Sequence, residues 1–162
     1  MIYEVEGDLM LSRAEVIVQG VGTFDPMTTG LSRKLHERFP SMVEEYRAWC
    51  EEENPEPGQL WMWDQPGKLS IINLITHEGD DDPTRLRRAD KIALNRSLKA
   101  LNAFYYEKRF KSMAMPMVGT GEYGLDWTDV RDMMHAQLGD LLIPIFVYTK
   151  QLDGQIAYEP GM

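Results

Sequence analysis

Short apolar segments rich in β-branched residues alternate along this chain with amphipathic segments, and this alternation limits the possible folds more than any other feature. Strands are expected over residues 2–6, 15–21, 59–64, 69–76, 112–117 and 143–148. Helices are expected over residues 31–39, from Ser41 as N-cap onward, over 85–110 and over 127–138. The pattern predicts a three-layer α/β/α sandwich around a mixed central sheet of about six strands.

The length of the chain limits the number of domains it can form, and its net charge limits the partners it can bind. A chain of 162 residues suits one domain, expected over residues 1–150, with residues 151–162 as a C-terminal tail of no strong pattern. The net charge of −9 argues against strong binding to nucleic-acid backbone or to an anionic membrane, since both require clustered Lys and Arg. A single cysteine, Cys50, excludes an internal disulfide. Without a signal peptide or a long apolar run, the chain is expected to be cytoplasmic.

Three glycines form a G-x-G-x-x-G pattern between an expected strand and an expected helix: Gly119, Gly121 and Gly124. A dinucleotide fold of this kind needs an acidic residue about 20 positions later, at the end of the next strand. Here that strand ends in Thr149 and Lys150. An NAD-dependent oxidoreductase is therefore a weakly supported alternative.

The glycines have another use that does not require a redox cofactor. A loop with few side chains exposes successive N–H groups and lets a phosphate approach the backbone closely. A second loop, GTFDPMTTGLS, also joins a buried strand to a helix and ends in Thr28, Thr29 and Gly30. Since the carboxyl ends of parallel strands meet at one edge of a sheet, the two loops could grip one diphosphate. A simple turn and a simple threonine N-cap remain the structural alternatives.

With Gly7, Asp8 and Leu9, these loops carry a resemblance to the macrodomain family of ADP-ribose-binding α/β/α modules. The similar segments are VEGDLM, AEVIVQGVGTFDPMTTGLSRKLHERFP, SIINLIT, AMPMVGTGEYGLDWTDV and FVYT. They run from residue 2 to about 149. Within the family, the chain most resembles the DNA ADP-ribosyl glycohydrolase antitoxins and the terminal ADP-ribose protein glycohydrolases.

The resemblance implies a set of binding residues for ADP-ribose. Asp8 would accept the adenine amino group, the Leu9 N–H would bind the adenine ring nitrogen, and Tyr148 would lie beside the base. The remaining implied contacts enclose the diphosphate and the distal ribose: Gly22, Thr28, Thr29, Gly30, Leu31, Gly119, Thr120, Gly121, Glu122 and Tyr123.

The chain departs from the family at the positions implied in catalysis. The family's lysine after the central strand corresponds to His77, its asparagine or serine near the distal ribose to Gly22, and its occasional catalytic aspartate to Tyr123. Histidine forms imines less readily than lysine, so His77 would act as a general base.

The sequence therefore predicts a protein that binds ADP-ribose or an ADP-ribosylated macromolecule and hydrolyses ADP-ribosyl linkages on nucleic acid or protein. The alternative is a non-catalytic sensor of ADP-ribose or a related nucleotide. No cofactor is expected. The acidic run from His77 to Asp82 lacks the alternating ligands of a calcium loop, so no metal site is expected either.

Overall fold

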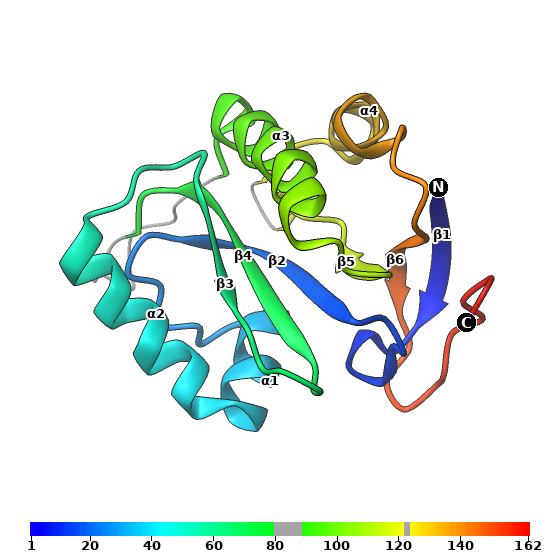
Figure 1. The fold of residues 1–162 in the computed structure, drawn as a ribbon, viewed down its shortest axis with the longest axis horizontal. Coiled ribbons are helices and arrows are strands. Elements are labelled where there is room, and N and C mark those ends of the chain that lie inside the picture. The colour runs from blue at the N-terminus through cyan, green and yellow to red at the C-terminus, as the bar shows by residue number, and fades with distance from the viewer. Residues whose placement is uncertain (80–88, 122–123) are drawn as a thin grey trace.

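The sheet at the centre of the computed structural model is mixed, and its strands follow the order β1-β6-β5-β2-β4-β3 (Figure 1). The structure describes residues 1–79, 89–121 and 124–162. Within them the strands are β1 (Ile2–Gly7), β2 (Val16–Gly22), β3 (Leu60–Trp63), β4 (Ser70–His77), β5 (Met113–Pro116) and β6 (Ile145–Gln151). Only β3 runs antiparallel to its neighbour among these strands; the other pairs are parallel.

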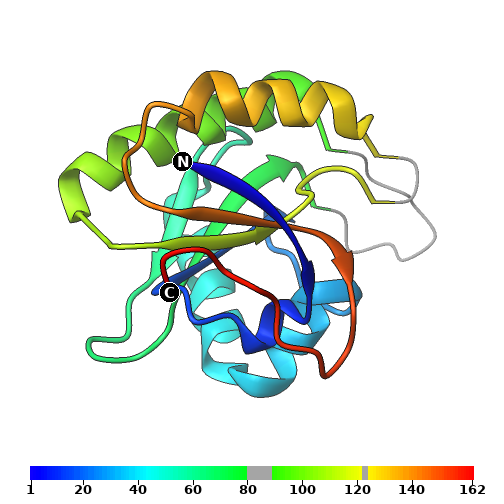
Figure 2. The same cartoon turned by 90° about the vertical axis from the view of Figure 1, so that its right-hand side faces the viewer.

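Helices cover both faces of the sheet. The helices α3 (Lys91–Lys108) and α4 (Trp127–Leu138) lie on one face, and α1 (Gly30–Arg38) and α2 (Pro40–Glu53) lie on the other (Figures 1 and 2). A short 3-10 helix, η1 (Leu9–Leu11), follows β1 on the side of α1. The predicted three-layer α/β/α arrangement is confirmed.

The two sides of β2 show why the sequence folds into layers. Successive side chains of a strand point to opposite faces. Val16 and Val18 accordingly pack in the cluster that contains Leu94 of α3, whereas Ile17 packs with Leu35 of α1. All of these side chains are at most 1% exposed, so β2 is buried on both faces, as a central parallel strand should be.

The end of the chain covers the part of the sheet that α1 and α2 do not reach. Ala157 packs in a third buried cluster with Leu9 and with Phe146 of β6. The backbone N–H of Asp8 donates to the carbonyl of Gln155 at 2.7 Å. Residues 152–162 therefore lie against η1 and the ends of β1 and β6 (Figure 2).

The starts of α2 and α3 differ from the sequence prediction by more than the one-residue shift of α1, which was expected over 31–39. The helix α2 begins at Pro40, with Phe39 at the N-cap position instead of Ser41, because proline fits the first turn of a helix without losing a hydrogen bond. The helix α3 begins at Lys91, where the Asp90 carboxylate accepts from the N–H of Ile92 at 3.1 Å. The expected start near residue 85 lies outside the described residues.

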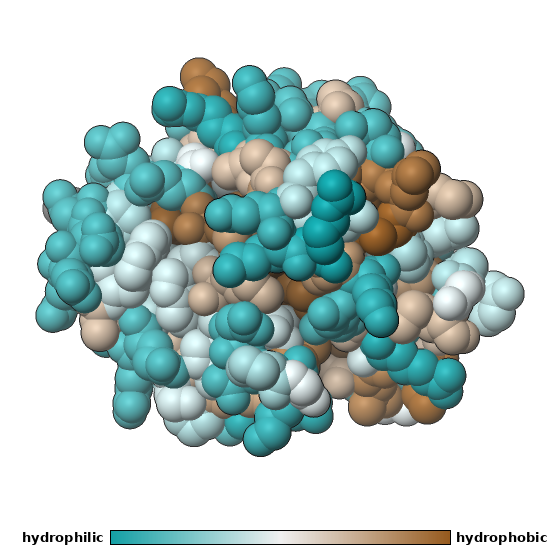
Figure 3. All heavy atoms as spheres, viewed as in Figure 1, coloured by the Kyte–Doolittle hydropathy of each residue, from teal (hydrophilic) through white to brown (hydrophobic). Residues whose placement is uncertain are grey.

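The surface is mainly hydrophilic on the face shown in Figure 3, with hydrophobic side chains in smaller groups between charged ones. In the part of the chain that the structure describes, no helix combines the length and hydrophobicity needed to cross a membrane.

Candidate functional site

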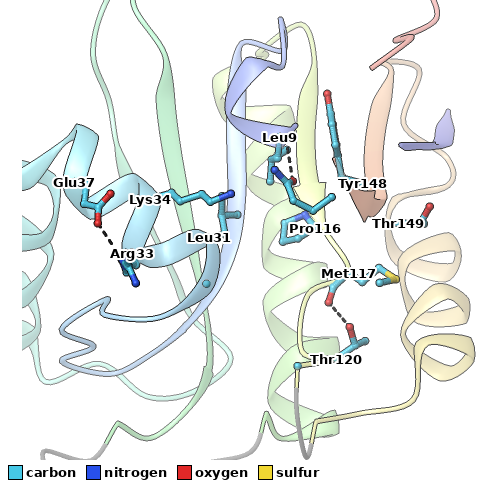
Figure 4. A pocket seen from close by; sticks show the side chains of 13 residues that line it. Leu9, Leu31, Arg33, Lys34, Glu37, Pro116, Met117, Thr120, Tyr148 and Thr149 are labelled. Carbon is cyan, nitrogen blue, oxygen red and sulfur yellow. Dashed lines mark hydrogen bonds and ion pairs between the residues drawn. The ribbon is translucent and has the colours of Figure 1, made fainter. Parts of the chain in front are cut away.

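The loops that follow the parallel strands meet at one edge of the sheet and enclose a cavity of about 710 Å³ (Figure 4). This is the edge at which open α/β sheets bind ligands. The lining comes from η1, one side of α1, the end of β5 with the loop after it, and β6. It consists of Leu9, Gly30, Leu31, Arg33, Lys34, Glu37, Pro116, Met117, Thr120, Gly121, Tyr148, Thr149 and Gln151.

One wall of the cavity is the amino end of α1. Thr29 occupies the N-cap position, but its side chain makes no capping hydrogen bond. Gly30 and Leu31, the first residues of the helix, line the cavity. Uncapped N–H groups and the helix dipole favour an anion at this position. Thr28 lies in a second, shallower hollow beside His36 and Pro40 instead.

The facing wall is the glycine loop after β5, in which each glycine has a different role. Gly119 has a φ of +76°, which favours glycine. A Cβ on Gly124 would lie 2.5 Å from the carbonyl oxygen of Gly119, so the close backbone approach requires a glycine there. Gly121 lines the cavity, and a Cβ on it would meet no atom of the described residues within 4 Å. The fold thus accounts for two of the three glycines, and the third keeps the cavity wall free of a side chain.

Within this loop, Thr120 closes a turn: its hydroxyl donates to the carbonyl of Met117 at 2.6 Å (Figure 4).

A carboxylate and a backbone N–H lie side by side where β1 ends. The Asp8 carboxylate accepts hydrogen bonds from the N–H of Met10 at 3.0 Å, from Nε2 of Gln151 at 2.9 Å and from the N–H of Gly154 at 2.9 Å. Burial by itself would raise the pKa of this carboxyl. The hydrogen bonds, led by that from Gly154, and the positive charge of Lys34 outweigh burial and lower the pKa below its ordinary value. Asp8 is therefore an ionised acceptor at neutral pH.

The Leu9 N–H beside it donates to the side-chain Oε1 of Gln151 at 3.2 Å.

Tyr148 of β6 supplies an aromatic side chain to the cavity lining while being only 4% exposed. Its hydroxyl donates to Oε2 of Glu159 at 2.9 Å, which ties the ring to the end of the chain. Burial, and then the hydrogen bond to Glu159, raise the pKa of Tyr148 above its ordinary value, so the phenol stays neutral. The ring is a fixed apolar surface against which a flat base could pack.

Two cations on α1 border the cavity and were not predicted from the sequence as site residues. Arg33 pairs with Glu37 at 3.0 Å, and Lys34 pairs with Asp153 at 2.9 Å. Both lie on the exposed side of an amphipathic helix, where charged side chains are common, so the sequence pattern alone does not mark them as site residues. The signal that could have identified them is that they lie within one turn of a helix start already implicated in phosphate binding. The lining residues Pro116, Met117, Thr149 and Gln151 were also missed. The first three lie within the resembling segments AMPMVGTGEYGLDWTDV and FVYT, whereas Gln151 lies beyond them.

The structure brings Gly22 and His77 into contact with each other. A Cβ on Gly22 would lie 2.8 Å from Nε2 of His77, so the imidazole occupies the space that a side chain at position 22 would need. Nδ1 of His77 lies 2.9 Å from the Thr76 hydroxyl. Neither Gly22 nor His77 is among the residues that line the cavity.

The remaining predicted residues either lie behind the cavity lining or fall outside the described residues. Gly119 packs behind the lining, where a Cβ would be 3.1 Å from Leu94. Glu122 and Tyr123, together with the acidic residues 80–82, lie outside the described residues. Within residues 1–79, 89–121 and 124–162 there is no group of three or more His, Cys, Asp or Glu side chains that could hold a metal ion.

A sequence model of the Macro domain matches residues 23–134, which is more than half of the chain. The chain belongs to the Macro domain family. The resemblance found in the sequence is thereby confirmed.

Curated relatives of this Macro domain act on ADP-ribosylated DNA according to their names. The chain is 28% identical over 153 residues to a DNA ADP-ribosyl glycohydrolase of Thermus aquaticus, a match covering 91% of the chain and 41% of the relative. It is 30% identical over 139 residues to a DNA ADP-ribosyl glycohydrolase of Mycobacterium tuberculosis, covering 83% of the chain and 38% of the relative. The chain thus spans about two fifths of the length of these relatives.

Solved structures share the fold over nearly the whole chain. The macrodomain of Thermus aquaticus DarG has a TM-score of 0.81 at 27% identity, covering 92% of this chain and 98% of that one. Thermosipho africanus DarTG in complex with ADP-ribose has a TM-score of 0.82 at 22% identity, covering 96% of this chain and 43% of that one.

Proposed function

We propose that this domain binds ADP-ribose, free or attached to a macromolecule, in the cavity at the carboxyl edge of its sheet. The observation that carries the proposal is the pairing of two walls suited to a diphosphate. The amino end of α1 presents Gly30 and Leu31, and the loop after β5 presents Gly121 from the other side. Backbone N–H groups can bind phosphate in a chain whose net charge is −9.

The adenine of the ligand would lie at the end of the cavity near Leu9 and Tyr148, and the distal ribose at the end near the glycine loop. Asp8 does not itself line the cavity, but it adjoins the lining residues Leu9 and Gln151 and offers an ionised acceptor beside the Leu9 N–H; the ring of Tyr148 belongs to the lining. These groups match the amino group, ring nitrogen and flat face of adenine. The distal ribose would then point along the glycine loop, past Thr120 and Gly121.

The reaction we propose is hydrolysis of the bond between the distal ribose and its acceptor atom on nucleic acid or protein. Water adds across that bond: its hydroxyl goes to the anomeric carbon and its proton to the acceptor atom, releasing ADP-ribose. The names of the curated relatives support DNA as the substrate class. His77 is the proposed general base for this water.

A non-catalytic sensor is the second candidate, and one observation favours it. His77 stands where the resemblance places a lysine, it lies against Gly22, and it is not among the residues that line the cavity. Incubating ADP-ribosylated DNA with the wild type and with His77→Ala separates the candidates. Hydrolysis by the wild type alone supports the enzyme with His77 as its base, and equal hydrolysis by both removes His77 from the mechanism. No hydrolysis by either, with binding intact, supports the sensor.

Binding itself is tested by Gly121→Glu. Because a Cβ at this position meets no atom within 4 Å in the part of the chain that the structure describes, the fold should tolerate the substitution. A carboxylate in the cavity should weaken ADP-ribose binding by at least about 10-fold, since like charges about 4 Å apart repel by several kcal/mol near a protein surface. Calorimetry gives the dissociation constants, and Gly121→Ala is the matched control, expected to bind nearly as the wild type does. If Gly121→Glu binds normally, the diphosphate does not lie at this loop.

A further inference from the structure

The side-chain amide of Gln151 is hydrogen-bonded to the same two groups that the proposed function assigns to the adenine, the Leu9 N–H and the Asp8 carboxylate. Oε1 of Gln151 accepts from the Leu9 N–H at 3.2 Å, and Nε2 donates to the Asp8 carboxylate at 2.9 Å. One amide thus bridges an acceptor and a donor that are neighbours in the chain. Gln151 is the last residue of β6 and lines the cavity, and Figure 4 shows the bond that reaches Leu9.

The chemistry of its partners fixes the orientation of this amide. Nε2 donates not only to Asp8 but also to the Asp153 carboxylate at 2.9 Å. Carboxylates only accept hydrogen bonds, and the Leu9 N–H only donates. A flipped amide would set its oxygen against two carboxylates and its NH₂ against an N–H. The arrangement with Nε2 toward the carboxylates is therefore the stable one.

An amide held in this way imitates the edge of adenine. Adenine presents an amino donor next to a ring-nitrogen acceptor, and a glutamine amide presents an NH₂ donor next to a carbonyl acceptor. Both fit one carboxylate and one adjacent N–H. An adenine that binds Asp8 and Leu9 must first displace Gln151, because the Leu9 N–H has a single hydrogen to donate.

We propose that Gln151 is a specificity-determining residue of this cavity, an intramolecular competitor that sets how much the base contributes to ligand binding. This inference rests on the proposed function. In the free protein the amide closes the base end of the cavity, and the diphosphate end stays open. A ligand with adenine replaces the hydrogen bonds of the amide with its own. The base therefore contributes to the binding free energy only the difference between the two sets of hydrogen bonds.

The second contact of Nε2 connects this competitor to the charges at the cavity rim. Asp153 accepts from Gln151 and, through the same Oδ1, pairs with Lys34. Removing the Gln151 side chain could therefore alter Lys34 as well as the base end. A test must separate an effect on the base from an effect on the phosphates.

The experiment compares ADP-ribose binding by the wild type, Gln151→Ala, Gln151→Met and Gln155→Ala. Gln151→Ala and Gln151→Met should each bind ADP-ribose about fivefold more tightly, since one net hydrogen bond of about 1 kcal/mol corresponds to that factor. Methionine keeps the length of glutamine, so a gain with alanine alone would show an effect of space and overturn the proposal. Gln155 contacts Asp8 through its backbone carbonyl, so Gln155→Ala is the matched control and should bind as the wild type does.

Inorganic diphosphate, which has no base, separates the two ends of the cavity. It should bind the wild type and Gln151→Ala equally, whereas an equal gain for diphosphate and ADP-ribose would place the effect at Lys34 and overturn the proposal. Unchanged or weaker ADP-ribose binding by Gln151→Ala, with normal binding by the wild type, overturns the inference and leaves the proposed function intact. Failure of every protein to bind ADP-ribose overturns both.

Discussion

The chain departs from the pattern of its family at both Gly22 and His77, and the structure shows why the two departures occur together. The imidazole fills the space beside the Gly22 backbone, and a Cβ at position 22 would also lie 3.1 Å from Cα of Gly79. An asparagine at position 22 therefore cannot be accommodated while His77 keeps its place. The sequence suggested two separate losses of catalytic groups, whereas the contact shows one coupled change.

This coupling predicts a non-additive double-mutant cycle. Gly22→Asn should lower the free energy of unfolding by about 1–3 kcal/mol, as overpacking does. Gly22→Asn combined with His77→Lys should lose less than the sum of the single changes, because the flexible lysine vacates the space of the imidazole ring. Urea unfolding of the four proteins measures the interaction energy. Losses that add to within about 0.5 kcal/mol would show that the two positions are independent.

Among the helices, the ends show how far sequence reasoning reaches. The helix α4 spans Trp127–Leu138, the range predicted from the sequence, and Asp126 occupies its N-cap position. The start of α2 was missed because Ser41 and Glu44 form a plausible capping box, yet Pro40 already occupies the first helical position. The apolar period identifies that a helix is present, and where two local signals compete, as at Pro40 and Ser41, it does not decide the first residue.

The caps of α3 and α4 provide a matched pair for measuring what a side-chain cap contributes. Asp90 accepts from the N–H of Ile92 at 3.1 Å, whereas the side chain of Asp126 makes no capping hydrogen bond. Asp90→Ala should lower the free energy of unfolding by about 1 kcal/mol. Asp126→Ala should lower it by less, since only the interaction with the helix dipole is lost. Equal losses in urea unfolding would mean that the hydrogen bond at Asp90 contributes nothing beyond its charge.

The candidate site as a whole is assembled from segments far apart in the chain, and this determines how much of it the sequence could reveal. Leu9, Leu31, Gly121 and Tyr148 were predicted together from the resemblance to the macrodomain family, and the structure brings them together because the carboxyl ends of the parallel strands lie at the same edge. Gln151 was not predictable. Its amide reaches Asp8 because the parallel register sets Gly7 opposite Gln151, with a shift between Val5 and Glu6 that no local pattern records.

The end of the chain also belongs to this assembly. Glu159 is 8% exposed and accepts hydrogen bonds from the Ser12 hydroxyl, the Arg13 N–H and the Tyr148 hydroxyl at 2.6, 2.9 and 2.9 Å. It therefore connects residues 152–162 to the segment after η1 and to a cavity side chain. The tail, which has no periodicity of its own, acts as the cover over this part of the sheet.

Glu159→Ala should lower the free energy of unfolding by about 2–4 kcal/mol, because it removes the acceptor of the buried Tyr148 hydroxyl and of two partly buried donors. Glu159→Gln should lose less, since its oxygen can still accept from the Arg13 N–H while the two hydroxyls turn to accept from its NH₂. Glu107→Ala, on the exposed side of α3, is the control and should change little. Urea unfolding followed by circular dichroism measures all three. If Glu159→Ala unfolds at the wild-type midpoint, residues 152–162 are not part of the cooperative unit. If it is destabilised and also binds ADP-ribose more weakly, the tail supports the cavity through the ring of Tyr148.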